Sequence, residues 1–194
     1  MRGDRPHSGL EEAVEAIRAG RVVGLPTDTV YGLGVDPMNQ DAVTRLFELK
    51  GRPKHKPVGL LVAGLEQAEA VGEITGPAAD LAAERWPGAL TLIVRPKVIM
   101  ADWVGDQQRR TVGIRVPAHP LALELLERTG PLSVTSANRS GGAEVSSDVQ
   151  ARELFGDAVE VYLAGTSPGG EASTVVDASD GELTLLRRGP IEIG

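Results

Sequence analysis

The chain has 194 residues, of which 41% are hydrophobic, and a formal net charge of −7 at pH 7. This length and apolar content suffice for one α/β domain with a buried core. The chain contains no cysteine, which excludes disulfides, thiolate catalysis and cysteine-based metal sites. Aromatic residues make up 3% of the chain, too few for a base-stacking platform on single-stranded nucleic acid. The first nine residues carry no apolar segment behind their charges and the longest apolar run is 89–94, so we expect a cytoplasmic protein without a membrane segment.

Hydrophobic periodicity and turn residues predict a chain in which helices and strands alternate. The predicted helices cover residues 8–19, 41–49, 66–71, 77–86, 120–129 and 147–155, and the predicted strands cover 22–25, 58–62, 89–94, 111–116, 132–134, 159–163, 174–177 and 183–187. The last two strands form a pair around Asp180 and Gly181. We therefore expect one domain, with its core at about 8–190, built on a twisted mixed sheet that is flanked by helices and has a concave ligand crevice.

The segment from Gly24 to Pro57 concentrates polar and basic residues in an acidic protein. Its loop PTDTVYG places four hydrogen-bonding side chains at the end of a short strand, and the helix that follows runs into four cations, Lys50, Arg52, Lys54 and Lys56. Such residues are common in turns and on solvated helix faces. Together, however, a dense basic segment beside clustered hydroxyls predicts that a specific anion binds here. Neither a GxGxxG nor a Walker A sequence is present, so a bound nucleotide would need another arrangement of cations and hydroxyls.

Three further groups of polar residues follow apolar strands. The first group follows the strand 132–134, where open α/β proteins bind ligands, although a polar loop would have a similar sequence. Its members are Ser133, Thr135, Ser136, Asn138, Arg139 and Ser140. Arg115 lies inside an apolar strand, which predicts either a structural ion pair or a clamp on a carboxylate. The third group contains Ser173, Thr174, Asp177, Arg187 and Arg188 at the C-terminal strand pair.

Six short segments occur in a characteristic order along the chain. They are PTDTVYGLG at 26–34, KGRP at 50–53, WPGALTLI at 86–93, GIRVP at 113–117, TSAN at 135–138 and STVVD at 173–177. In this order they resemble the YrdC/Sua5 family of threonylcarbamoyl-AMP synthases over roughly residues 10–190. The chain resembles the short, single-domain, YrdC-like form of that family. Longer members have a histidine in the strand after the KxR segment, whereas this chain has Leu60 and Leu61, as apolar short-form relatives do.

The resemblance implies an enzyme, a nucleotidyltransferase that makes L-threonylcarbamoyladenylate and pyrophosphate from L-threonine, bicarbonate or CO₂, and ATP with Mg²⁺. The product supplies the threonylcarbamoyladenosine modification of tRNA, and a separate transferase complex is the implied partner. The implied catalytic residues are Lys50, Arg52, Ser136 and Asn138. The implied ATP-binding residues are these four with Lys56, Thr111, Ser146 and Arg188, and the implied threonine-binding residues are Thr29, Arg115, Thr135 and Ser173. No metal ligand among the protein side chains is implied.

Two alternatives remain at this point. One is a YrdC-like module that binds double-stranded RNA, whose affinity would fall steeply with salt; the net charge of −7 argues against it. The other is a paralogue that keeps the nucleotide site and uses another carbamoyl acceptor. The threonine-type positions Thr29, Arg115 and Ser173 favour the synthase.

Overall fold

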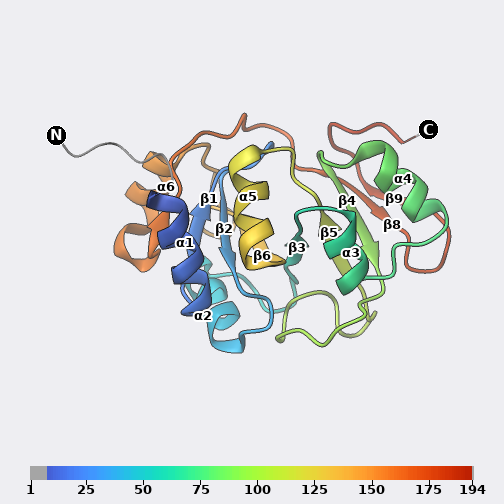
Figure 1. Cartoon of the computed structure of the whole chain (residues 1–194), viewed down its shortest axis with the longest axis horizontal. Helices are drawn as coiled ribbons and strands as arrows, with labels where there is room; N and C mark the ends of the chain where they lie inside the picture. The colour runs from blue at the N-terminus through green and yellow to red at the C-terminus, as the bar shows by residue number, and fades with distance from the viewer. Residues whose placement is uncertain (1–7, 194) are drawn as a thin grey trace.

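The computed structural model describes residues 8–193, which form a nine-stranded sheet that extends across the molecule (Figure 1). The strand order is β7-β1-β2-β6-β3-β5-β4-β8-β9. The strands are β1 (Val23–Leu25), β2 (Gly32–Val35), β3 (Gly59–Leu61), β4 (Leu90–Val94), β5 (Val112–Arg115), β6 (Leu132–Ser136), β7 (Val161–Tyr162), β8 (Thr174–Asp177) and β9 (Thr184–Arg187). Pairs β1–β7, β3–β5 and β4–β8 are parallel, and the other neighbours are antiparallel. The prediction of a mixed sheet is confirmed.

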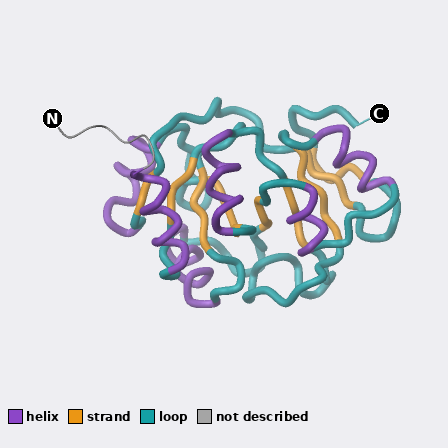
Figure 2. Tube along the Cα trace, viewed as in Figure 1, coloured by secondary structure: helices purple, strands orange, loops and turns teal. Residues whose placement is uncertain are grey.

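Helices cover the sheet (Figure 2). Their buried side chains form two apolar clusters with it. The helices are α1 (Ser8–Arg18), α2 (Gln40–Lys50), α3 (Leu65–Val71), α4 (Pro77–Arg85), α5 (Pro120–Thr129) and α6 (Asp148–Phe155), followed by a short 3₁₀ turn at Gly156–Ala158. Buried residues of α1 and α5 form one cluster with parts of β1, β3 and β6, and α2, α3, α4 and α6 contribute to the other. All six predicted helices are present within two residues of their expected ends.

None of the helices in the described part of the chain combines the length and hydrophobicity needed to cross a bilayer. The sequence predicted no apolar segment in the first nine residues. Residues 1–7 lie outside the described residues.

Strand β2 was not predicted, because Gly32 and Gly34 suggested a loop and glycine is depleted in strands. The structure pairs β2 with β1 on one side and with β6 on the other. A Cβ atom on Gly32 would lie 2.7 Å from Val134 Cγ1. The glycine therefore allows β2 and the side chains of β6 to pack closely. This requirement comes from the tertiary structure, and the strand propensities of single residues do not reveal it.

The register of β3, β5 and β6 gives the middle of the sheet two different faces. Leu60 pairs with Ile114 and both belong to the apolar core, whereas the next residues, Leu61 and Arg115, pair with each other and point to the opposite face. Gly113 lies on that second face two residues before Arg115. Because glycine has no side chain, the sheet surface beside Arg115 stays open, and the candidate site lies over it.

Candidate active site

A cleft of about 300 Å³ lies over the middle of the sheet. Its walls come from the loop after β1, the segment after α2, strands β3 to β6, the loop after β6 and the C-terminal strand pair. Its lining residues are Thr29, Val30, Arg52, Val58, Gly59, Leu60, Leu61, Thr91, Gly113, Arg115, Val134, Thr135, Ser136, Glu144, Ala172, Ser173 and Arg187. The crevice expected from the sequence is therefore present, and it collects residues that are up to 158 positions apart, from Thr29 to Arg187.

Arg115 is held at one end of the cleft by three neighbours. Its Nη2 donates to Asp28 Oδ1 at 2.6 Å, its Nη1 to Thr29 Oγ1 at 3.0 Å and its Nε to the carbonyl of Gly88 at 3.0 Å. Burial lowers the pKa of Arg115, and the Asp28 carboxylate opposes this shift. A guanidinium has five N–H donors, so two remain for a ligand. Of the two readings of Arg115, the ion pair is present, and it leaves donors for a carboxylate.

Ser173 lies in the same cleft, just before β8, and its hydrogen bonds link it to β4 and β9. Its Oγ is 2.8 Å from Thr91 Oγ1 in β4. Arg187, at the end of β9, donates from Nε and Nη2 to the carbonyl of Ser173 and from Nη2 to its Oγ at 3.1 Å. Both Arg187 and the predicted ATP-binding residue Arg188 are exposed, and of the two Arg187 lines the cleft.

Arg52 lies at the other end of the cleft. It donates to the carbonyls of Lys56 and Pro57 at 2.8 and 2.9 Å, and its Nη1 is 3.4 Å from Thr135 Oγ1. Burial lowers the pKa of Arg52. The turn that follows α2 therefore folds around this guanidinium and presents it to the cleft beside Thr135 and Ser136.

Lys50 is the last residue of α2 and its side chain is enclosed, with the residue 3% exposed. Its ammonium donates to the carbonyls of Ser136 and Asn138 and to Asn138 Oδ1, at 2.5, 2.6 and 2.9 Å. Ser136 Oγ donates to the same Asn138 Oδ1, and Asn138 Nδ2 donates to the carbonyl of Gly142. Burial lowers the pKa of Lys50 to about 8, with a further contribution from Arg52.

The remaining predicted residues lie outside this cleft. Thr111 is buried in the wall of an adjoining hollow of about 250 Å³, which shares Gly59, Thr91 and Arg187 with the cleft. The Lys56 side chain is exposed, and Ser146 hydrogen-bonds to Gln150 at the start of α6. The assignment of roles to all of these residues stays a prediction.

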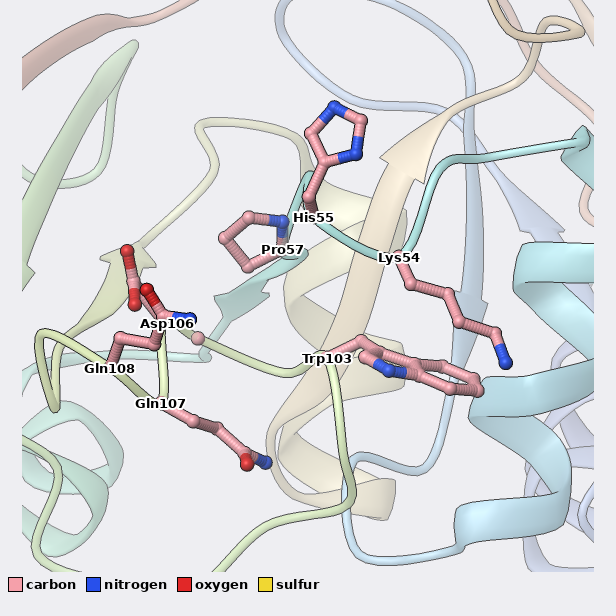
Figure 3. A pocket seen from close by; sticks show the side chains of 8 residues that line it. Lys54, His55, Pro57, Trp103, Asp106, Gln107 and Gln108 are labelled. Atoms are coloured by element: carbon pink, nitrogen blue, oxygen red, sulfur yellow. The ribbon is translucent and has the colours of Figure 1, made fainter.

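The four cations at 50–56 do not act as a single basic patch. Lys50 is buried and Arg52 lines the cleft, while Lys54 lies over the ring of Trp103 with Nζ 4.6 Å from its centroid. Figure 3 shows this side chain beside the indole, in a separate hollow of about 290 Å³ that also contains His55. Binding of a specific anion by this segment stays a prediction, while the structure directs Lys50 towards its own loop and Lys54 towards an aromatic ring.

Several lining residues were not among the predicted ones. Thr91 was detectable as a polar residue within the apolar strand ALTLIV, since the opposite faces of a strand alternate. Asp28 is not a lining residue but holds Arg115, and it was in the PTDTVYG loop without an assigned partner. Glu144 supplies a carboxylate to the cleft wall, and its place in a long loop gave no sequence signal.

The chain belongs to the family whose model, named for Sua5, YciO and YrdC and described as "Telomere recombination", matches residues 15–189. Among curated proteins, it is 43% identical to a putative threonylcarbamoyl-AMP synthase of Mycobacterium tuberculosis over 94% of this chain and 85% of that protein.

Solved structures agree with this placement. The Sua5 protein of P. abyssi complexed with L-threonine matches with a TM-score of 0.85 and 36% identity, over 93% of this chain and 54% of that one. YciO of E. coli matches with the same TM-score at 26% identity, over 94% and 90% of the two chains. The chain thus spans about half of the P. abyssi protein.

Proposed function

We propose that this protein is an L-threonylcarbamoyladenylate synthase, which forms threonylcarbamoyl-AMP and pyrophosphate from L-threonine, bicarbonate or CO₂, and ATP. The observation that carries the proposal is the composition of the cleft. All four predicted threonine-binding residues, Thr29, Arg115, Thr135 and Ser173, line it together with Arg52 and Ser136 from the predicted phosphate site. Relatives named for this activity support the proposal.

The Arg115 end fits the amino acid. A guanidinium whose orientation is fixed by Asp28 and Thr29 has donors left for the carboxylate of threonine, and charge-assisted pairs of this kind are strong. Hydroxyls at Thr29, Thr135 and Ser173 can pair with the threonine side-chain OH. A site built to pair a hydroxyl rejects an analogue that lacks it, because its own polar groups would be left without partners.

The Arg52 end fits the phosphates. The amine of threonine takes up CO₂ as a carbamate, a carbamate oxygen attacks the α-phosphorus of ATP, and the bond to the β-phosphate breaks to release pyrophosphate. No enzyme nucleophile is needed. The protein contributes by aligning two anions that repel each other and by placing positive charge and hydrogen-bond donors around the transferring phosphate. We assign this work to the segment of Lys50 and Arg52 and to the loop of Ser136 and Asn138.

Magnesium fits the cleft as a companion of ATP. The described residues contain no group of three or more histidine, aspartate or glutamate side chains that could hold a metal ion. Mg²⁺ is usually bound through substrate phosphates with one or two carboxylates, and Glu144 is the carboxylate in the cleft lining. When bound, the ion neutralises charge on the phosphates.

The product is a mixed anhydride of a carbamic acid and a phosphate, and it is therefore chemically unstable outside a protein. We therefore expect a partner that takes the threonylcarbamoyl group to tRNA, and we assign this step to a separate transferase complex. A direct RNA contact of this chain stays a hypothesis.

The test is pyrophosphate release by the purified protein with ATP, Mg²⁺ and bicarbonate, with and without L-threonine, and with serine and valine as controls. Release that needs both threonine and bicarbonate is the expected result. Release without threonine would instead favour a paralogue with another carbamoyl acceptor, and no release under any condition would contradict the synthase.

A further inference from the structure

We infer that Lys50 and Asn138 do not contact the nucleotide but act as positioning residues, which brace the loop that carries Ser136, so that Arg52 is the one of these four side chains that donates to phosphate. This inference rests on the proposed function for the identity of the ligand. It divides a set of residues that the sequence predicted to act together. The braced loop is residues 136–142.

The hydrogen-bonding capacity of Lys50 carries the first step. An ammonium group has three N–H donors and no acceptor. All three have partners within the protein, namely two backbone carbonyls and Asn138 Oδ1 at 2.5–2.9 Å. A phosphate oxygen could gain a bond from this group only if one of these buried acceptors lost its own.

The same end of α2 is bonded to the loop through its backbone as well. The amide of Ser140 donates to the carbonyl of Lys50 at 2.9 Å, and Arg139 Nη1 donates to the carbonyl of Leu49 at 3.2 Å. The helix end and the braced loop are therefore joined by several independent bonds. Removing the ammonium would take away the bonds to Ser136 and Asn138 and would leave the bonds from Arg139 and Ser140 to the helix end.

Asn138 is engaged through both atoms of its amide group, with 9% of the residue exposed. Its Oδ1 accepts from Lys50 and from Ser136 Oγ, and its Nδ2 donates to the carbonyl of Gly142 at 2.7 Å. It therefore closes the loop on itself. Arg52 differs from this pair, since it lines the cleft and has N–H donors left beyond its three contacts. Ser136 also lines the cleft, but its hydroxyl hydrogen is donated to Asn138.

The first measurement uses the wild-type protein. Scalar couplings across the hydrogen bonds from Lys50 Nζ to the carbonyl carbons of Ser136 and Asn138 are recorded on protein with ¹⁵N-labelled lysine, before and after saturation with inorganic tripolyphosphate. We expect both couplings to persist with the ligand bound. Loss of either coupling on addition of tripolyphosphate would overturn the inference.

The second measurement removes the brace without any ligand. In Lys50→Met, the backbone amide shifts of residues 136–142 are expected to move in the free protein. The matched control is Lys97→Met, which removes an ammonium that also donates to a backbone carbonyl, that of Glu69, on an exposed surface. Unchanged shifts at 136–142 together with weakened tripolyphosphate binding would mean that Lys50 contacts phosphate directly.

The third measurement is a double-mutant cycle on tripolyphosphate affinity by calorimetry. If Lys50 and Asn138 act through one loop, Lys50→Met and Asn138→Ala each weaken binding by roughly tenfold and the double variant is no weaker than the poorer single one. Multiplication of the two losses to roughly a hundredfold would contradict a shared role. Failure of wild type to bind tripolyphosphate or MgATP would count against the proposed function, while the shifts in free Lys50→Met would still decide the brace.

Discussion

The two ends of the cleft hold their cations in different ways. Arg115 lies within β5 and is fixed by a carboxylate, whereas Arg52 follows a helix end and is fixed by two backbone carbonyls and a hydroxyl. The positive charge of Arg115 is thus already balanced by Asp28, and that of Arg52 faces dipoles without formal charge. Under the proposed function, we therefore expect the Arg115 end to receive the small carboxylate of threonine and the Arg52 end to receive the more highly charged phosphates.

The largest expected effect comes from removing the Arg115 side chain. Arg115→Ala leaves Asp28 without its buried partner, with an expected loss of about 3 kcal/mol in the free energy of unfolding. We expect a loss of roughly a hundredfold or more in kcat/KM for threonine, because two charge-assisted bonds disappear. Urea unfolding and steady-state pyrophosphate release measure the two effects. A variant with normal threonine kinetics would remove Arg115 from the amino-acid site.

Arg128→Ala is the matched control for this variant. Arg128 also pairs with a carboxylate, Glu11, but on the exposed surface of α5. Exposed pairs contribute little to stability, so both unfolding and activity should stay close to those of wild type.

At the Arg52 end we expect a change in activity with little change in stability. Arg52→Ala removes a cation whose partners are carbonyls next to solvent, and the expected loss is roughly tenfold or more in kcat/KM for ATP. Titration of MgATP at saturating threonine measures it. A loss that appeared in the KM for threonine alone would reverse the assignment of the two ends.

The third prediction compares neighbouring arginines at the C-terminal strand. Both residues are exposed, but Arg187 contacts Ser173 and lines the cleft, whereas Arg188 lies outside the lining. Arg187→Ala should lower kcat/KM about three- to tenfold by loosening Ser173, in line with the loss of one or two hydrogen bonds. Arg188→Ala should change it by less than about twofold. The opposite order of effects would support the alignment of Arg188 with the ATP site.

The smallest effect is a pH dependence at the loop. The pKa of Lys50 is about 8, lowered chiefly by burial and then by Arg52, with Glu144 opposing the shift. Above this pH the Lys50 ammonium is deprotonated and loses one of its three N–H donors to the braced loop. Activity should therefore fall to about half of its maximum near pH 8. The pH profile of kcat/KM measures this limb, and Lys50→Met should lack it.

Stability should change with the opposite sign. Between pH 8 and 10.5 the unfolded chain still holds the Lys50 proton that the folded protein has released. The free energy of unfolding should therefore rise with pH in this window for wild type relative to Lys50→Met. A fall relative to the variant would show that the folded-state pKa is not lowered.

Much of the fold could be predicted because local rules agreed with it. The helix α2 illustrates this, since Val43, Leu46 and Phe47 at helical spacing are all buried in the structure, and Gly51 ends the helix at a φ of 61°. The strand β2 escaped prediction because its glycines are explained by the neighbouring side chain of Val134, which lies about one hundred residues further along the chain.

The sequence by itself determined the element types apart from strand β2, the mixed sheet and the side chains proposed to bind anions and amino acids, because helical spacing, turn chemistry and side-chain type are local properties. Only the tertiary structure decided which of those residues face the same space. Burial and pairing turn Lys50 towards its own loop, Lys54 towards an indole ring and Arg187 towards Ser173. These contacts join residues far apart in the chain, and their geometry depends on strand register and helix ends that no local pattern specifies.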